Sequence, residues 1–326
     1  MTARTLPPPG QLAICFAHPA YRLQERFVLR GTGIGSFEAR TMDELKAGIG
    51  QAHVLCVSGF WRNELVPHAA RLGFIQSISA GTDQYSREAL AAAGIRAASA
   101  QGVNERAVAE HAIGLMLAVA RKLPLSFANQ AEHRWRGLIP EIAQREDELG
   151  GKTLVIVGMG RIGSRLALLA RAFDMRVIGV KRDPSRGAAA ADAVVPQSQL
   201  LEVLPQADFV ALTCPLNPTT QGLIDARAFA AMKPTACLVN VARGRVVDEP
   251  ALVEAMRSGA IAAAALDCAW EEPLPPGSPL WELPGVIVTP HSAGETQRYE
   301  DNVIDLLLEN LQRLWRGEPE LKNGFV

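Results

Sequence analysis

The sequence predicts an α/β protein with two doubly wound parallel sheets, each in a domain of its own. Its 326 residues exceed the size at which one hydrophobic core usually stops growing, so two domains are expected. Short apolar runs alternate with longer helix-compatible segments, which is the rhythm of parallel strands joined by helical crossovers. This rhythm occurs in two series, and a polar stretch at 141–148 lies between them.

The first series indicates a small parallel α/β unit. A long helix is predicted to follow it at about 105–122; the helix is apolar over much of its circumference and therefore buried, and Pro124 is expected to end it. The glycine cluster at 31–35 leads into a polar stretch without a long helix and is interpreted as a turn. The strand candidates of this series lie at 12–18, 52–58, 74–80 and 95–99.

The second series predicts the larger sheet. It opens at Gly150 and Gly151, and each pair of parallel strands again requires a right-handed crossover. A final helix is expected at about 295–316, beyond the last strand. The strand candidates lie at 153–157, 176–180, 208–212, 236–240, 261–266 and 286–289.

Composition narrows the function classes. The 33 basic and 34 acidic side chains leave a net charge of -1, so no overall field favours nucleic acid or an anionic membrane. The five cysteines form no CxxC pair; we interpret them as buried reduced thiols and predict no metal site. No apolar stretch approaches the length that spans a bilayer. The sequence therefore predicts a cytoplasmic protein whose partner is a small molecule.

Three glycines form the strongest local signal. Gly158, Gly160 and Gly163 make a GxGxxG pattern directly between a β-branched strand and an apolar-periodic helix. In that context the first glycine permits a tight turn, the second lets a pyrophosphate approach the backbone, and the third lets helix and strand pack closely. The helix start offers free N–H groups and a positive dipole end to the phosphates. The pattern predicts a Rossmann domain that binds a dinucleotide.

The end of the next strand favours NADP(H) over NAD(H). An acidic side chain at this point would bind the ribose 2′-hydroxyl, whereas a cation suits a 2′-phosphate. The strand RVIGVKRDP ends at Lys181 and Arg182. Asp183 has the spacing of a ribose acid, but it precedes Pro184 and is predicted to start a turn. NAD(H) remains the alternative, in which both cations point into solvent.

Three later segments carry residues suited to acid/base chemistry. Arg243 lies just past a predicted strand, where ligands of an open α/β sheet bind, and its guanidinium fork can grip a carboxylate. Arg245 is its local competitor and is expected to face solvent or the phosphates. Glu271 and Glu272 follow the next strand, and His291 follows the last one. A histidine can protonate a ketone oxygen at neutral pH, and a nearby carboxylate would orient it.

Together these segments resemble the D-isomer-specific 2-hydroxyacid dehydrogenases, and the likeness is closest in character to NADPH-dependent glyoxylate/hydroxypyruvate reductases. NAD-dependent members usually place an aspartate where Lys181 stands. Residues before about 75 follow the family only loosely, including 58–66, where the substrate-facing loop is expected. The matching motifs are AGTD at 80–83, NERAVAEHAIGLML at 104–117, GGKTLVIVGMGRIG at 150–163, CPLNPTTQGLID at 214–225, NVARGRVVDE at 240–249, ALDCAWEEPLPPGSPLW at 265–281 and TPHSAG at 289–294.

The resemblance implies domains, an assembly and residue roles. It implies a discontinuous flavodoxin-like substrate domain at 1–103 and 295–326, a Rossmann NAD(P)-binding domain at 104–294, and a homodimer. The carboxylate that pairs with the catalytic histidine is then Glu272, and Glu271 faces solvent. The implied residues are Arg243, Glu272 and His291 for catalysis; Ala80, Gly81, Arg243 and His291 for substrate; and Val108, Gly158, Met159, Gly160, Arg161, Ile162, Gly163, Lys181, Arg182, Thr213, Pro215, Thr219, Val241, Ala242, Asp267 and His291 for cofactor.

The sequence thus predicts an oxidoreductase that reduces small 2-keto acids, such as glyoxylate or hydroxypyruvate, to D-2-hydroxy acids with NAD(P)H. Two alternatives stay open. A family of nucleotide-sensing transcriptional corepressors shares the fold and the Arg/Glu/His set, although the chain has no long polar extensions for recruiting partners. NAD-dependent oxidation of another small acid, such as formate, is the other alternative; formate-oxidising relatives typically carry glutamine where Glu272 stands.

Overall fold

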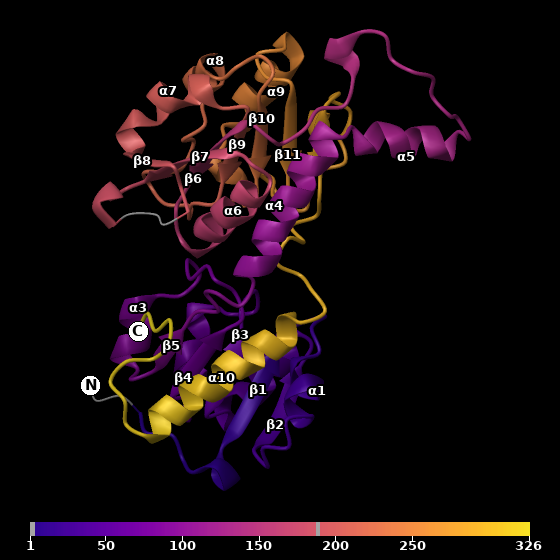
Figure 1. Cartoon of the computed structure of the whole chain (residues 1–326). Coiled ribbons are helices and arrows are strands. Elements are labelled where there is room, and N and C mark those ends of the chain that lie inside the picture. Colours follow the sequence, from indigo (N-terminus) through magenta and orange to yellow (C-terminus); the bar gives the residue numbers. More distant parts are fainter. Residues whose placement is uncertain (1–3, 187–189) are drawn as a thin grey trace. The chain divides into compact units, whose positions relative to one another are not determined.

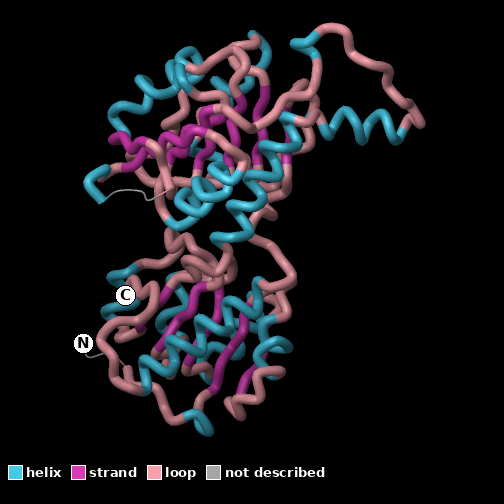
Figure 2. The backbone as a smooth tube through the Cα atoms, in the orientation of Figure 1, coloured by secondary structure: helices cyan, strands magenta, loops and turns pink. Residues whose placement is uncertain are grey.

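The computed structural model describes residues 4–186 and 190–326, and the chain divides into two compact units (Figure 1). The first unit comprises residues 1–104 and 296–326, and the second comprises residues 105–295. Each unit contains one parallel sheet flanked by helices (Figure 2). The predicted fold class, α/β with two parallel-sheet domains, is therefore confirmed.

The first unit is a five-stranded parallel sheet between two helical layers. Its elements are β1 Ala13–Ala17, α1 Leu23–Val28, β2 Gly35–Ala39, α2 Met42–Gly48, β3 Val54–Val57, β4 Phe74–Ser77, α3 Arg87–Ala92, β5 Arg96–Ala98 and α10 Tyr299–Trp315. The strand order is β2-β1-β3-β4-β5. Successive strand residues face opposite sides, so Phe16 packs in the layer of α1 and α10 whereas Cys15 packs in the layer of α2 and α3.

The second unit is a seven-stranded parallel sheet. Its elements are α4 Glu105–Ala120, α5 Leu123–Ala131, β6 Thr153–Val157, α6 Arg161–Ala172, β7 Arg176–Lys181, β8 Ala193–Pro196, α7 Leu200–Val203, β9 Phe209–Leu212, α8 Ala226–Ala231, β10 Cys237–Asn240, α9 Glu249–Ser258, β11 Ala263–Leu266 and β12 Val286–Val288. The strand order is β12-β11-β10-β9-β6-β7-β8. Helices α4 and α6 cover one face, and α7, α8 and α9 cover the other.

Two strands were not predicted from the sequence, and both lie at sheet edges. Strand β2 (35–39) is the first strand of its sheet, and β8 (193–196) is the last strand of the other. An edge strand is paired on one side only and needs no continuous apolar run. The residues of β8 are all half-buried, and most of β2 is half-buried or exposed. The glycines at 31–35 were interpreted as a turn, but Gly35 is the first residue of strand β2, which was not predicted.

The expectation that Pro124 ends a helix was wrong. Helix α4 ends at Ala120, and Pro124 lies in the first turn of a further helix, α5, that was not predicted. The first turn tolerates proline because its N–H groups have no partner within the helix. Lys122, in a left-handed conformation with φ 48°, separates the two helices.

The structure also describes the cysteines and the apolar character of the helices. All five cysteines are free and buried, as expected for reduced thiols. Among the described residues, no helix combines the length and the apolar character that crossing a membrane requires.

Candidate active site

The glycine loop between β6 and α6 is a close-packed turn with one open position. Gly158 has φ 108°, and a Cβ there would lie 2.6 Å from the Cys214 nitrogen. A Cβ on Gly163 would lie 2.1 Å from the Gly158 carbonyl oxygen, whereas a Cβ on Gly160 would meet nothing within 4 Å. Thr213 closes the turn, because its hydroxyl donates to the Gly158 carbonyl at 2.7 Å. The loop therefore has the shape that a pyrophosphate group requires.

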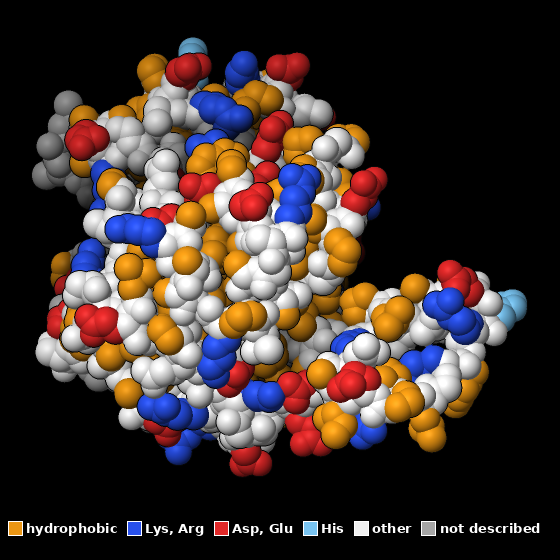
Figure 3. All heavy atoms as spheres, turned by 90° about the horizontal axis from the view of Figure 1, so that it is seen from above, with side chains coloured by type: hydrophobic (Ala, Val, Ile, Leu, Met, Phe, Trp, Pro, Cys, Tyr) orange, Lys and Arg blue, Asp and Glu red, His pale blue; other side chains and the backbone are white. Residues whose placement is uncertain are grey.

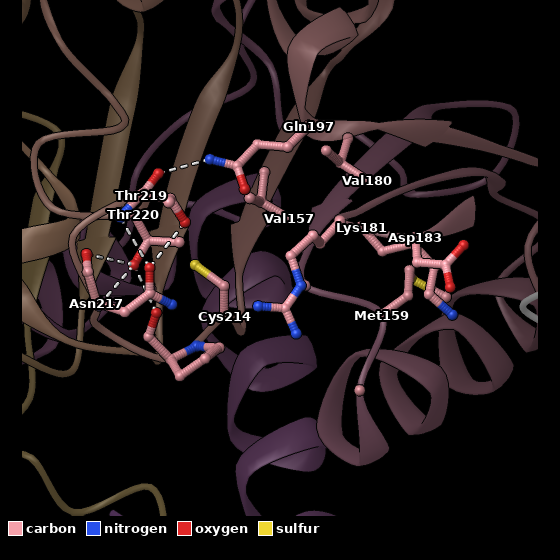
Figure 4. A pocket seen from close by; sticks show the side chains of 14 residues that line it. Val157, Met159, Val180, Lys181, Asp183, Gln197, Cys214, Asn217, Thr219 and Thr220 are labelled. Atoms are coloured by element: carbon pink, nitrogen blue, oxygen red, sulfur yellow. Dashed lines mark hydrogen bonds between the residues drawn. The ribbon is translucent and has the colours of Figure 1, made fainter. Parts of the chain in front are cut away.

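A cavity of about 440 Å³ lies beside this loop (Figure 4). It opens at the carboxyl ends of β6, β7 and β9, where the strand order reverses direction and open α/β sheets bind their ligands. Among the described residues, no cluster of three or more His, Cys, Asp or Glu side chains could hold a metal ion. The lining residues are Val157, Gly158, Met159, Gly160, Val180, Lys181, Arg182, Asp183, Gln197, Cys214, Pro215, Asn217, Thr219 and Thr220.

The end of β7 brings two cations to the cavity. Lys181 is the last residue of the strand and is half-buried, and Arg182 is exposed beside it. The carboxylate of Asp183 accepts hydrogen bonds from the Ser185 backbone nitrogen at 3.1 Å and from its hydroxyl at 2.6 Å. Asp183 thus starts the turn that the sequence predicts, and its carboxylate is hydrogen-bonded to Ser185 within this turn.

Besides the apolar Val157 and Val180, four lining residues were not predicted from the sequence: Gln197, Cys214, Asn217 and Thr220. Gln197 follows the unpredicted strand β8, and its amide donates to the Thr219 carbonyl at 2.6 Å. Asn217 accepts from the backbone and the hydroxyl of Thr219 at 2.9 and 2.8 Å. Cys214, Asn217 and Thr220 lie inside the family motif at 214–225, so this motif could have indicated them. Gln197 lies outside every matching motif, and nothing in the sequence indicated its place in the cavity.

The proposed catalytic side chains follow three adjacent strands. Arg243 comes after β10, Glu272 after β11 and His291 after β12, and these strands are neighbours in the sheet. The His291 Nδ1 atom lies 2.8 Å from the Glu272 Oε2 atom. The other carboxylate oxygen accepts from the Ala269 backbone nitrogen at 3.1 Å. The structure thus brings together the histidine and the carboxylate that the sequence paired.

The electrostatics of Glu272 favour its charged form. Burial is the largest single influence and would raise the pKa of this carboxyl, but the lowering influences together outweigh it, first among them the hydrogen bond and the positive charge of His291. The Ala269 N–H group and the Arg243 guanidinium add to the lowering. Arg243 therefore lies near enough to the pair to act on it electrostatically.

A buried aspartate anchors the segment that carries His291. Asp267 is 2% exposed, and its carboxylate accepts from the Thr289 hydroxyl at 2.7 Å and from the Ser292 and Ala293 backbone nitrogens at 2.9 and 3.0 Å. These bonds flank His291, whose φ of 54° is uncommon for a residue with a side chain. Asp267 was expected to line the cofactor; the structure gives its carboxylate this anchoring contact, which the sequence did not indicate.

At Gly244 and Arg245, the segment that carries Arg243 packs closely against the segment that carries Glu272. A Cβ on Gly244 would lie 1.8 Å from the Ala269 carbonyl oxygen, so only glycine fits. The Arg245 guanidinium lies over the Trp270 ring, 5.6 Å from its centre. Arg245 was expected to face solvent or the phosphates; it is exposed, but it stacks on this indole.

The other sequence-predicted residues are placed as follows. Ala80 and Gly81, half-buried, follow β4 in the first unit. In the second unit, Val108 is buried in α4, Arg161 and Ile162 begin α6, and Val241 and Ala242 are buried after β10. These five residues of the second unit do not line the cavity beside the glycine loop. Three other residues that were expected to bind the cofactor do not line it either: Thr213, Gly163 and Asp267.

Comparisons with known proteins agree with this architecture. Residues 113–293 match the model of the D-isomer specific 2-hydroxyacid dehydrogenase NAD binding domain. The D-3-phosphoglycerate dehydrogenase of Methanocaldococcus jannaschii is 36% identical over 281 residues, which are 85% of this chain and 52% of that protein. The chain thus spans about half the length of this relative.

A second relative is matched over most of its length. The glyoxylate reductase of Aeropyrum pernix is 36% identical over 274 residues, 81% of this chain and 80% of that protein. Among solved structures, the TT0316 protein of Thermus thermophilus superposes with a TM-score of 0.83 at 33% identity, covering 97% of this chain and all of that one. The chain belongs to the D-isomer specific 2-hydroxyacid dehydrogenase family.

Proposed function

We propose that the protein reduces small 2-keto acids, such as glyoxylate or hydroxypyruvate, to D-2-hydroxy acids with NADPH. The observation that carries this proposal is the pairing of His291 with Glu272 at 2.8 Å, beside Arg243, on the sheet whose glycine loop fits a dinucleotide. In this proposal the second unit (105–295) binds the cofactor, and the first unit (1–104 and 296–326) is the substrate domain.

The glycine loop fits the cofactor's pyrophosphate. Gly160 leaves open space for it, and α6 begins directly after Gly160, so the backbone N–H groups and the positive dipole end of this helix lie beside that space. Lys181 and Arg182 would hold a 2′-phosphate, and Pro215 and Thr219 would line the adenosine end of the cavity. When bound, the nicotinamide supplies the hydride.

His291 supplies the proton. Its Nδ1 atom is engaged by the Glu272 carboxylate, so Nε2 is the atom that can reach a substrate. The carboxylate fixes the orientation of the ring, and protonated His291 then transfers the Nε2 proton to the ketone oxygen as it becomes an alkoxide. Glu272 remains ionised throughout, because its pKa is held below the usual range.

Arg243 binds the substrate. Its guanidinium can form two parallel hydrogen bonds with the carboxylate of a keto acid and stabilise charge on the adjacent carbonyl oxygen. Its Nη1 atom donates to the Ala242 carbonyl at 2.7 Å, which restricts where the fork can point. In the first unit, Ala80 and Gly81 are proposed as further substrate-binding residues, as the family resemblance implies.

A second candidate function uses the same hydride and proton transfer in the opposite direction, as oxidation, and acts on a different substrate. The likeness to the D-3-phosphoglycerate dehydrogenase of M. jannaschii supports NAD-dependent oxidation of a larger 2-hydroxy acid. The two cations at Lys181 and Arg182 favour the NADPH reductase instead, since neither can accept the ribose hydroxyl protons that NAD offers.

Initial rates distinguish these functions. NADPH and NADH oxidation would be followed with glyoxylate, hydroxypyruvate, pyruvate and phenylpyruvate, and NAD reduction with 3-phosphoglycerate. We expect the fastest turnover with NADPH on glyoxylate or hydroxypyruvate. Turnover of 3-phosphoglycerate with NAD alone would favour the second candidate. Absence of turnover with every acid, together with measurable cofactor binding, would move the proposal to a nucleotide-sensing corepressor.

We also propose that the protein is a homodimer that pairs through the segment 123–146, named the arm here. The arm begins with α5 and extends away from the rest of the second unit (Figure 1). It exposes large apolar side chains (Figure 3), including Phe127, Trp135 at 99% exposure and Leu138 at 98%. Exposed apolar surface of this extent is typical of an interface. Light scattering should give a dimer mass, and Trp135→Ser with Leu138→Ser should lower it; a monomeric wild type would refute the dimer.

A further inference from the structure

A second histidine, on helix α4, contacts the segment that carries His291. The His111 Nε2 atom lies 3.0 Å from the Thr289 hydroxyl oxygen and 3.5 Å from the Asp267 Oδ1 atom. All of these residues belong to the second unit. The His111 side chain is 25% exposed, whereas that of Asp267 is 3% exposed. The proton transfer proposed above does not use His111, so this contact calls for an explanation of its own.

The direction of the hydrogen bond between His111 and Thr289 follows from the proton count. An ionised carboxylate can only accept, so the Thr289 hydroxyl gives its single proton to Asp267, at 2.7 Å. The Thr289 oxygen must then accept from His111, which places a proton on the His111 Nε2 atom. The imidazolium and the neutral ring in this tautomer both carry that proton. His111 therefore donates to Thr289 in either charge state.

The backbone at His291 has a conformation that its neighbours must hold. Its nitrogen donates to the Thr289 carbonyl at 2.9 Å, and its φ of 54° is sparsely populated by residues with a side chain. Asp267 holds the segment on both sides of His291, through the Thr289 hydroxyl before it and the Ser292 and Ala293 nitrogens after it. The bond from His111 adds a tie from Thr289 to a helix.

Helix α4 is a firm support for this tie. Ala112, next to His111 in the helix, is fully buried and belongs to the same hydrophobic core as Ala293. This packing holds the helix beside the segment, but apolar burial has no directional preference. The hydrogen bond from His111 supplies the direction, because it specifies where the Thr289 side chain lies.

We propose that His111 is a positioning residue for the proton transfer, which holds the His291 imidazole beside Glu272. It does so by donating to Thr289, whose hydroxyl then stays on Asp267. The His291 Nδ1 atom thereby keeps its 2.8 Å contact with Glu272, and its Nε2 atom stays available to the substrate. This inference rests on the proposed reductase function and adds a residue to its machinery. His111 itself transfers no proton.

The kinetic test compares two replacements of His111. His111→Leu removes the donor, whereas His111→Gln keeps an N–H donor on the side chain. In His111→Leu we expect kcat with glyoxylate and NADPH to fall about tenfold, the upper range for one neutral hydrogen bond, with both KM values nearly unchanged. The solvent deuterium isotope effect on kcat should rise, because a displaced His291 slows the proton transfer. His111→Gln should restore most of kcat and the wild-type isotope effect.

A double-mutant cycle tests whether His111 acts through Thr289. Thr289→Val removes the hydroxyl and should lower kcat at least as much as His111→Leu. Adding His111→Leu to Thr289→Val should cause little further loss, because the two side chains form one network. Losses that multiply independently would overturn the action through Thr289. Glu110→Ala, at the exposed neighbour of His111 on α4, is the control and should leave kcat unchanged.

A measurement that needs no turnover separates this inference from the proposed function. Heteronuclear NMR of protein labelled at its histidine nitrogens reports on the six imidazole rings, and His291→Asn assigns the His291 signals. We expect His111→Leu to shift the His291 signals and His111→Gln to restore them, with equal thermal unfolding of all three proteins. Unchanged His291 signals in His111→Leu would overturn the inference, whatever happens to kcat. A wild type that turns over no keto acid would overturn the proposed function instead, and the NMR result would still decide whether His111 positions His291.

Discussion

The two sheets of this protein end in loops of different chemistry. In the second unit, the carboxyl ends of the strands carry charged or titratable side chains, namely Lys181, Arg243, Glu272 and His291. In the first unit, the ends of β3 and β4 carry the hydroxyls of Ser58 and Ser79, the amide of Gln84 and two backbone nitrogens that meet no acceptor within the described ranges. The named residues of the second unit thus present charge, whereas those that follow β3 and β4 of the first unit present neutral hydrogen-bonding groups.

The difference indicates a division of roles, in which the charged groups of the second unit carry out the reaction and the neutral groups of the first unit distinguish between substrates. Charged groups stabilise charge that develops during a reaction, so their removal should slow turnover of every substrate. Neutral groups discriminate between ligands that differ by a hydroxyl, so their removal should change ratios between substrates. The predictions below test this division, beginning with the largest expected effect.

Replacing His291 with asparagine should lower kcat for all 2-keto acids alike. The variant cannot deliver a proton, and general acid catalysis is typically worth roughly 10²–10⁴-fold. His68→Asn, at an exposed histidine of the first unit, should leave kcat unchanged. Steady-state rates with glyoxylate and pyruvate provide the measurement. A fall with one substrate only would contradict the division, and turnover close to wild type would refute the role of His291.

Replacing Gly244 with alanine should lower kcat by roughly 10–100-fold, because small misplacements of catalytic groups have effects of this size. The new Cβ would lie 1.8 Å from the Ala269 carbonyl, so the segment that carries Glu272 must move away from Arg243. Gly277→Ala is the matched control, since a Cβ there meets nothing within 4 Å.

Cofactor titration completes this test. Gly244→Ala should bind NADPH as the wild type does, because the glycine loop lies on other strands of the sheet. Unchanged kcat would show that the packing of the two segments does not position Glu272. A loss of cofactor binding instead would show that the substitution disturbs the whole second unit.

Replacing Lys181 with alanine should lower the preference for NADPH over NADH by about tenfold, because a hydrogen bond to a charged group contributes roughly 1.5–3 kcal/mol. The effect should appear in KM for NADPH, with kcat nearly constant. Arg176→Ala removes a cation at the opposite end of the same strand and should not change the preference. If both variants behave alike, the cations act through overall charge and a 2′-phosphate site at Lys181 is refuted.

The sequence predicted the buried strands of both units but not the edge strands β2 and β8, for a physical reason. Buried parallel strands need continuous apolar runs, and β6 and β10 carry them, whereas the edge strands β2 and β8 do not. The His291–Glu272 pair could be predicted because each residue follows a strand end within a family motif. The anchoring by Asp267 and the hydrogen bond from His111 to Thr289 depend on segments that meet only after folding.

The smallest predicted effect concerns stability in acid. The pKa of Glu272 lies below its usual range in the folded protein, so ionised Glu272 stabilises the fold above about pH 4.5. This contribution is lost as the pH falls through the lower folded-state pKa. The Tm advantage of wild type over Glu272→Gln should therefore shrink as the pH falls below about pH 5. Because both side chains of the pair are about two-fifths exposed, the difference should stay below about 1 kcal/mol.

A carboxylate in the first unit sharpens this last prediction. The hydrogen bond from Arg26 lowers the pKa of Asp301, with the charge of Arg26 adding to it, so Asp301→Asn should show the same acid dependence of Tm. The two substitutions should differ in activity, however. Glu272→Gln removes the carboxylate that orients the His291 ring and should lower kcat, whereas Asp301 pairs with Arg26 in the first unit and its replacement should not. Equal loss of kcat in both variants would mean that acid-sensitive ion pairs act through stability alone, and the distinction between the two sheets would then not extend to catalysis.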